Sequence, residues 1–149
     1  VELLAEKITD RADEATFMAT MEDWVQSFGK IDVVMTIGDT LALSAYEVVK
    51  DDDTYKDTQY YGVDGLPESL LAIKRGHMTA TVMQDTDEMA QLNLEAAAKL
   101  LKGEEEVIES EMEAILITAD NVDEYLDYYV EKGALTQEEV DEVRAEVDG

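Results

Sequence analysis

Apolar runs typical of β-strands alternate along this chain with segments that have helical spacing. This alternation limits the folds that the chain can adopt. The run at 31–37 (IDVVMTI) is continuous and rich in β-branched residues, as expected of a strand buried on both faces of a parallel sheet. Further strand-like runs lie at 59–63, 78–83 and 114–118. Short connections between strands and helices predict an α/β fold with a mainly parallel sheet flanked by helices.

The helical segments carry start and stop signals. One helix is predicted to end at Gly29, because apolar residues precede it at the spacing of one helical face: Ala15, Met18, Met21, Trp24, Val25 and Phe28. Pro67 suits the first turn of a helix that ends near Arg75. Further helices are expected at 41–50, 86–102 and 121–132. The last one, over 136–147, begins with the capping-box pair Thr136 and Glu139.

The start of the chain is more ambiguous. Residues 1–8 (VELLAEKI) are predicted to form a short strand, although Leu, Ala and Glu leave a helix possible. The polar segment 51–58 (DDDTYKDT) is expected to be a solvated loop. It lacks the Gly and the distal Glu of an EF-hand, so it does not predict a calcium site.

The net charge of the chain argues against nucleic acid and anionic lipid as partners. The chain has 37 Asp and Glu against 11 Lys and Arg, a formal net charge of −26. Such a surface repels phosphate backbones and anionic lipid, so nucleic-acid binding is not expected. An apolar content of 46% is too high for a disordered acidic tail, and 149 residues suffice for one domain with a core. No apolar run approaches the ~18–20 residues of a membrane span.

The sequence lacks the residues and motifs that would indicate an enzyme. The chain has no Cys and a single His, which excludes disulfides and Cys nucleophiles and makes a transition-metal site unexpected. It contains no G-x-S-x-G motif and no Gly-rich phosphate loop. We therefore predict that the protein is not an enzyme and uses no cofactor or metal.

Polar residues follow three of the predicted strands at the point where each strand ends. These are Gly38–Asp39, Asp64–Gly65 and Gln84–Asp85. In open parallel sheets, ligands bind in the crevice beyond the carboxyl ends of the strands. Asp64 before a glycine is also what a simple turn requires, Gln84 could be a solvated strand end, and Asp39 or Thr40 could cap the next helix.

Three blocks of the sequence resemble a known family: IDVVMTIGDTLALSAYEVV, GVDGLPESLLAIKRGHMTATVMQD and AAAKLLKGEE…ILITADNVDEYL. They are similar to consecutive blocks of the periplasmic sugar-binding proteins of ABC transporters, in the ribose- and galactose-binding class. The resemblance runs from about Val1 to about Tyr129. It implies a type 1 periplasmic-binding-protein fold, in which two α/β lobes joined by three crossings hold a sugar in the cleft between them.

The resemblance also implies a domain division. Residues 1–84 would form most of the second, C-terminal lobe. Residues 85–113 would be a crossing and a helix that belong to a largely missing first lobe, and 114–149 would be a terminal strand and helices, with 131–149 unassigned. We therefore expect the chain to be a C-terminal fragment. The helix at 89–101 has an apolar face that needs a partner, so self-association of the fragment is expected.

The function that the resemblance implies is the solute-binding component of a carbohydrate ABC importer, binding a small sugar or polyol. Such a protein would be extracytoplasmic, in the periplasm or as a cell-surface lipoprotein, and would dock on the membrane subunits of an ABC permease. The alternative is the effector-sensing domain of a lactose-repressor-type regulator, which has a similar fold. A response-regulator-like or flavodoxin-like domain would need a phosphorylatable acidic pocket or a phosphate loop, and the sequence has neither.

Ligand-binding residues follow from the same resemblance. Asp64 and Gln84 are predicted to hydrogen-bond sugar hydroxyls, since a carboxylate accepts from two hydroxyls and an amide both donates and accepts. Gly38 stands where the family commonly carries an Asn that touches the sugar, which puts the identity of the ligand in doubt. Asp39 is also placed among the ligand-binding candidates, although helix capping competes for it.

The remaining aromatic residues are assigned to structural roles. Trp24 is predicted to lie in the core, and Tyr60 and Tyr61 to split between the two faces of their strand. The late tyrosines Tyr125, Tyr128 and Tyr129 are expected to pack on a helix face. The only histidine, His77, is expected to be exposed.

Overall fold

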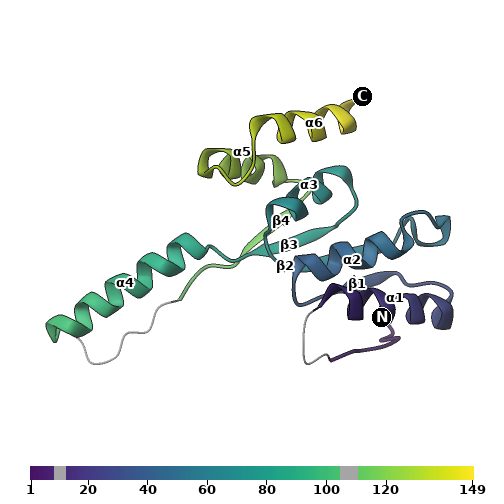
Figure 1. Ribbon diagram of the computed structural model, residues 1–149, viewed down its shortest axis with the longest axis horizontal. Helices are drawn as coiled ribbons and strands as arrows, with labels where there is room; N and C mark the ends of the chain where they lie inside the picture. The colour runs from purple at the N-terminus through teal and green to yellow at the C-terminus, as the bar shows by residue number, and fades with distance from the viewer. Residues whose placement is uncertain (9–12, 105–110) are drawn as a thin grey trace.

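The structure is a computed structural model that describes residues 1–8, 13–104 and 111–149. Within these residues, helices and strands alternate in the order α1, β1, α2, β2, α3, β3, α4, β4, α5 and α6 (Figure 1). Their bounds are α1 Glu14–Phe28, β1 Val33–Met35, α2 Asp39–Val49, β2 Gln59–Asp64, α3 Pro67–Arg75, β3 Ala80–Met83, α4 Thr86–Lys102, β4 Ile115–Thr118, α5 Val122–Lys132 and α6 Gln137–Asp148. A 3-10 turn, Asp53–Tyr55, lies in the loop between α2 and β2.

The sheet is mainly parallel, which confirms the predicted fold class. Its strand order is β1-β2-β3-β4, with β1–β2 and β2–β3 parallel and β4 antiparallel to β3. Asp64 at the end of β2 pairs with Met83 at the end of β3. The carboxyl ends of these neighbouring strands therefore meet at one edge of the sheet, as the prediction required.

Local signals set the helix ends. The Asp13 side chain caps α1 by accepting a hydrogen bond from Thr16 N at 2.8 Å, and Gly29 ends that helix with a φ of 62°. The predicted capping box of α6 is present: Thr136 Oγ1 accepts from Glu139 N, and the Glu139 carboxylate accepts from Thr136 N. The pKa of Glu139 lies below its usual value because Thr136 donates to its carboxylate.

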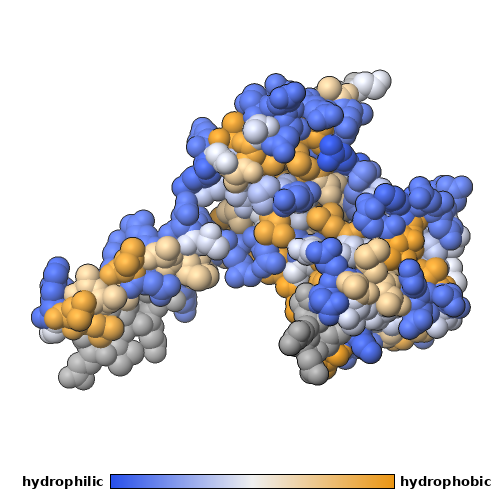
Figure 2. Space-filling view, in the orientation of Figure 1, coloured by the Kyte–Doolittle hydropathy of each residue, from blue (hydrophilic) through white to orange (hydrophobic). Residues whose placement is uncertain are grey.

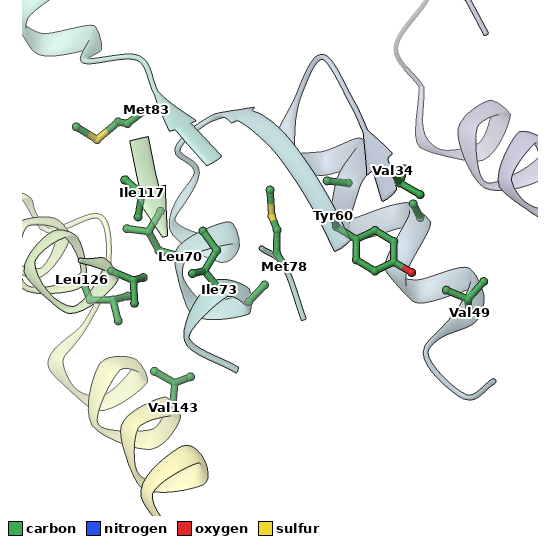
Figure 3. Packing of buried hydrophobic residues seen from close by; sticks show 14 of the residues in the cluster. Val34, Val49, Tyr60, Leu70, Ile73, Met78, Met83, Ile117, Leu126 and Val143 are labelled. Carbon is green, nitrogen blue, oxygen red and sulfur yellow. The ribbon is translucent and has the colours of Figure 1, made fainter. Parts of the chain in front are cut away.

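The core lies between the sheet and the helices. Figure 3 shows Ile117 of β4 gathered with side chains of α3, α5 and α6. Val140 and Val143 of α6 are fully buried, so the terminal helix belongs to this core. Residues 131–149, which the resemblance left unassigned, therefore supply part of the packing that holds α3 in place.

An ion-pair network ties the same helices together at the surface. Asp123 of α5 accepts from Lys74 of α3 at 2.7 Å and from Arg144 of α6 at 2.9 Å, and Arg144 also contacts Asp127 at 2.9 Å. The donated hydrogen bond from Lys74 is the main reason that the pKa of Asp123 lies below its usual value. One carboxylate thus joins three helices.

The second face of the sheet is open at the edge strands β1 and β4, which corrects the prediction of a strand buried on both faces. Val34 of β1 is 4% exposed, whereas Met35 is 78% exposed. The exposed Met35 pairs with Tyr61 of β2, and Leu116 of β4 is exposed on the same face. Burial alternates along β1 because the core covers one face and β1 is an edge strand.

The predicted strand at 1–8 is also wrong. These residues form neither helix nor strand, and Leu3 and Ile8 are exposed. A β-strand needs a neighbour for its backbone hydrogen bonds, and residues 1–8 do not pair with the free edge of β1.

Trp24 and His77 each pack against another aromatic ring. Trp24 is half-buried and packs edge-on against Phe17, with ring centroids 6.3 Å apart. His77 is half-buried, which corrects the expectation of an exposed side chain. It stacks on Tyr46 with centroids 4.5 Å apart, and burial lowers its pKa. The predicted split of the tyrosine pair is confirmed, since Tyr60 is buried in the core and Tyr61 lies on the open face.

Helix α4 leaves the body of the molecule (Figure 1). Its first turn contacts α5 through the ion pair of Asp87 with Lys132, and beyond that turn no other helix among the described residues lies beside it. No residue of α4 is buried, and Figure 2 shows apolar residues on its surface. Leu94 is 72% exposed and Leu101 is 90% exposed, while Met89 and Leu100 are exposed to a lesser degree. Among the described residues, no helix has the length and apolar character needed to span a membrane.

Candidate functional site

Asp64 and Gln84 lie together at the carboxyl edge of the sheet. Asp64 is the last residue of β2, and Gln84 directly follows β3. The Gln84 amide Nε2 donates a hydrogen bond to Asp64 Oδ1 at 3.0 Å. Gln84 is exposed and Asp64 is half-buried, so neither side chain is enclosed by apolar packing. The sequence thus predicted that they meet, and the structure brings them into contact.

A cavity of about 500 Å³ opens beside Asp64. Gly38 lies on its wall, and a Cβ placed on Gly38 would come within 3.1 Å of Asp64 Oδ2. The residues that line the cavity come from α1, from α2 and from the strand ends: Asp13, Glu14, Ile37, Gly38, Thr40, Leu41 and Asp64. Three of the four candidates, Gly38, Asp64 and Gln84, are therefore within one small region.

Asp39 is separated from this group. It is the first residue of α2 and is 0% exposed, while Gly38 takes the N-cap position that was predicted for Asp39 or Thr40. Its Oδ1 accepts from the Thr81 hydroxyl at 2.6 Å, and its Oδ2 accepts from Leu66 N at 2.8 Å. The carboxylate does not line the cavity, and its two hydrogen bonds tie the start of α2 to β3 and to the turn after β2.

Burial raises the pKa of Asp39 above its usual value, while the hydrogen bonds from Thr81 and Leu66 oppose this effect. The carboxylate can approach β2 only because residue 62 is glycine. A Cβ on Gly62 would overlap the Asp39 carboxylate and come within 2.8 Å of Met78 Cε. Gly62 and Asp39 therefore form one packing unit beneath the site.

The turn that carries Asp64 has an unusual backbone. Asp64 has a φ of 115°, which L-residues rarely adopt, and Gly65 follows with a φ of 71°. Gly65 N donates to Thr81 Oγ1 at 3.1 Å, and the Gly65 carbonyl accepts from the Tyr129 hydroxyl. Such a conformation persists only where the surroundings fix it, and here hydrogen bonds from β3 and α5 do so.

Several of these residues escaped the sequence analysis. Thr81 and Tyr129 hold the turn through hydrogen bonds that span 16 and 64 positions, and no local pattern predicts such pairs. Asp13 and Glu14 begin α1, and they line the cavity because α1 packs beside α2. A capping Asp at a helix start was visible in the sequence, but its distance from Asp64 was not.

The cavity suits a ligand that donates hydrogen bonds. Asp13, Glu14 and Asp64 offer carboxylate oxygens and Thr40 offers a hydroxyl, and none of the lining residues that the structure describes is a Lys, Arg or His. Carboxylates accept hydrogen bonds from hydroxyls, and such charge-assisted bonds are the stronger kind.

In the described part of the chain, no group of three or more His, Asp or Glu is arranged to hold a metal ion.

The mainly parallel sheet flanked by helices is an architecture that this chain shares with type 1 periplasmic binding proteins among the solved structures. Residues 1–105 match the periplasmic binding protein domain, and the chain belongs to this family.

Individual relatives agree with this assignment. The chain is 31% identical over 121 residues to the xylitol-binding protein of Mycolicibacterium smegmatis, covering 80% of this chain and 34% of that protein. It is 32% identical to the ribose import binding protein of Bacillus subtilis, covering 61% of this chain and 29% of the relative. The crystal structure of an ABC transporter solute binding protein from Bacillus halodurans C-125 with bound myo-inositol superposes with a TM-score of 0.70 at 31% identity. That match covers 78% of this chain and 40% of the other. The chain thus spans less than half the length of these relatives.

Proposed function

We propose that this chain forms most of one lobe of the solute-binding component of a carbohydrate ABC importer. The ligand would be a small sugar or polyol, held between this lobe and a second one. The names of the relatives support this class of ligand, since they concern xylitol, ribose and myo-inositol. The full protein would act outside the cytoplasm and deliver its ligand to the membrane subunits of an ABC permease.

The observation that carries the proposal is the 3.0 Å hydrogen bond between Gln84 and Asp64 at the carboxyl edge of the sheet, beside a cavity. In our proposal, Asp64 accepts hydrogen bonds from ligand hydroxyls. Gln84 keeps the Asp64 carboxylate in position and offers its remaining amide groups to the ligand. Asp39 acts indirectly, by fixing the backbone on which Gly38 and Asp64 lie.

The domain division forms part of the proposal. Residues 1–84 would belong to the second lobe, 85–113 to a crossing and to the first lobe, and 114–149 to the terminal strand and helices. The exposure of α4 supports this division, because a helix with apolar side chains and no buried residue is expected to pack on something else. Ligand contacts from both lobes would then stabilise a closed state by a hinge motion.

The test uses the protein expressed from its complete reading frame, which in our proposal encodes both lobes. Thermal-shift and calorimetric titrations with ribose, xylitol and myo-inositol are expected to reveal at least one ligand, since binding to the folded state raises the unfolding temperature. Asp64→Asn is expected to weaken that binding about tenfold or more, because a charged acceptor is lost. Asp120→Asn, an exposed carboxylate in the turn after β4, is the matched control and should bind as the wild type does.

Residues 1–149 alone form a second arm of the test. This chain lacks the opposite wall of the proposed cleft, so we expect binding too weak for calorimetry. Tight monosaccharide binding to the isolated chain would contradict the proposed division into lobes. Failure of the complete protein to bind any sugar or polyol would overturn the proposed function itself.

A further inference from the structure

The backbone at Gly38 does not require a glycine. Its φ of −161° and ψ of 151° are those of an extended residue, which any side chain tolerates. Gly38 is also the N-cap of α2, a position at which glycine is accepted about as well as threonine and less well than Ser, Asp or Asn. The backbone conformation does not account for this glycine, and helix capping allows it without requiring it.

The lack of room for a side chain beside Asp64 does account for a glycine at position 38. A Cβ on residue 38 would lie 3.1 Å from Asp64 Oδ2, which is closer than ordinary van der Waals contact. The carboxylate cannot easily turn away, because Gln84 Nε2 holds its Oδ1 at 3.0 Å and the Asp64 backbone is itself held in an unusual conformation. The absence of a side chain at Gly38 therefore keeps the approach to Oδ2 open.

The two oxygens of Asp64 consequently differ. Oδ1 is occupied by the Gln84 amide, whereas no side chain or backbone group among residues 1–8, 13–104 and 111–149 donates a hydrogen bond to Oδ2. Oδ2 faces the gap at Gly38, and the cavity that both residues line also has apolar walls from Ile37 and Leu41. Ile37 is 78% exposed, so its side chain is available for contact with ligand carbon.

We infer that Gly38 forms a recess for a carbon branch of the ligand, next to the hydroxyl that Asp64 Oδ2 binds. This inference rests on the proposed function and narrows the ligand to neutral polyols that carry a substituent such as a hydroxymethyl group. The hydroxyl binds Oδ2, and the carbon of the branch occupies the space above Gly38 against Ile37. A side chain at residue 38 would fill the same space.

Matched pairs of sugars test this directly. D-Glucose and D-xylose differ, as pyranoses, only in the hydroxymethyl group, and so do D-galactose and L-arabinose. Calorimetric titration of the complete protein is expected to show that the branched member of at least one pair binds more tightly. Gly38→Ala is expected to weaken binding of that branched sugar about tenfold while leaving the unbranched partner within about threefold, since one methylene group in a pocket decides affinities of this order.

Two controls separate the possible outcomes. Gly133→Ala makes the same substitution at the end of α5, where nothing lies within 4 Å of the added carbon, and is expected to leave the sugar preference unchanged. Gly38→Asn should exclude the branched sugar more strongly than Gly38→Ala, and retained binding of the unbranched sugar shows that a variant is folded.

The two proposals fail in different ways. Wild-type protein that binds no sugar or polyol overturns the proposed function. Wild-type protein that binds such ligands, but shows no preference for a branched member or keeps that preference in Gly38→Ala, overturns the recess and leaves the proposed function standing.

Discussion

The Thr81 hydroxyl of β3 lies 2.6 Å from Oδ1 of Asp39 at the start of α2, and both side chains are fully buried. The same hydroxyl accepts from Gly65 N at 3.1 Å, so it joins two loops of the site. A buried carboxylate is costly unless its oxygens are hydrogen-bonded, and here Thr81 and Leu66 supply the donors. The position of the Asp64 turn therefore depends on a side chain on the neighbouring strand.

Replacement of Thr81 by Val is expected to destabilise the fold by about 2 kcal/mol, because Asp39 loses a donor and Gly65 N loses an acceptor in a buried place. Urea denaturation of residues 1–149 measures this. Thr79→Val removes another partly buried threonine hydroxyl of the same segment, which accepts a single hydrogen bond from Tyr60 N, and should cost less. Equal effects of the two substitutions would contradict the linking role of Thr81.

The free energy of unfolding should depend on pH through the protonation of Asp39. Burial raises its pKa in the folded state above the ordinary value of 3.8. The contribution of Asp39 to the free energy of unfolding is therefore greatest below pH 3.8 and is lost as pH rises through the raised pKa. Relative to Asp39→Asn, the wild type should therefore lose free energy of unfolding as pH rises through the raised pKa. Urea denaturation at a series of pH values checks this, and a shift of opposite sign would show that the folded-state pKa is lowered.

The contribution of Asp123 to stability should depend on pH in the opposite direction. Lys74 and Arg144 lower its pKa, so its contribution is present above the ordinary value of 3.8 and is lost as pH falls through the lowered pKa. The Asp123 side chain is half exposed, and solvent screening should limit the cost of Asp123→Asn to below about 1 kcal/mol at neutral pH. High salt should reduce that cost further. A cost that survives both high salt and acid would show that the network acts through packing rather than charge.

Much of the fold was predictable because its signals are local. Gly29 predicted where α1 ends, Pro67 predicted where α3 begins, and the capping box predicted the start of α6. The meeting of Asp64 with Gln84 was predictable for a different reason. Parallel neighbouring strands end at the same edge of a sheet, so residues that follow such strands are brought together whatever their separation in sequence.

The remaining features depend on contacts that no local pattern encodes. Asp39 looked like a helix cap, and its burial follows from a partner 42 positions away. Tyr129 looked like a residue of a helix face, and its role follows from contact with Gly65. The β-branched run around β1 predicted burial on two faces, but composition cannot say which segments are present to cover each face.

Close packing at Gly62 predicts a severe effect of one added methyl group. A Cβ there would overlap the Asp39 carboxylate and come within 2.9 Å of the Asp39 Cα, which cannot yield as a flexible side chain would. Gly62→Ala is therefore expected to destabilise the fold by about 3 kcal/mol. Gly133→Ala is the matched control: its φ of 73° costs about 1 kcal/mol, but the added carbon meets nothing. Chemical denaturation compares the two. Equal losses would mean that Asp39 can move aside at little cost.

The exposed helix α4 predicts self-association of residues 1–149. Met89, Leu92, Ala96 and Leu100 recur at the spacing of one helical face, and the exposed Leu94 and Leu101 widen the apolar surface. Contiguous apolar surface of this kind tends to be buried against a partner, and a second copy of the chain is the partner present in a pure sample. Sedimentation velocity should therefore show a concentration-dependent dimer or larger species. Leu94→Glu with Leu101→Glu should shift it toward monomer, whereas Thr86→Glu, at the exposed first position of the same helix, should not. A chain that remains monomeric at high concentration would show that this apolar face stays solvated.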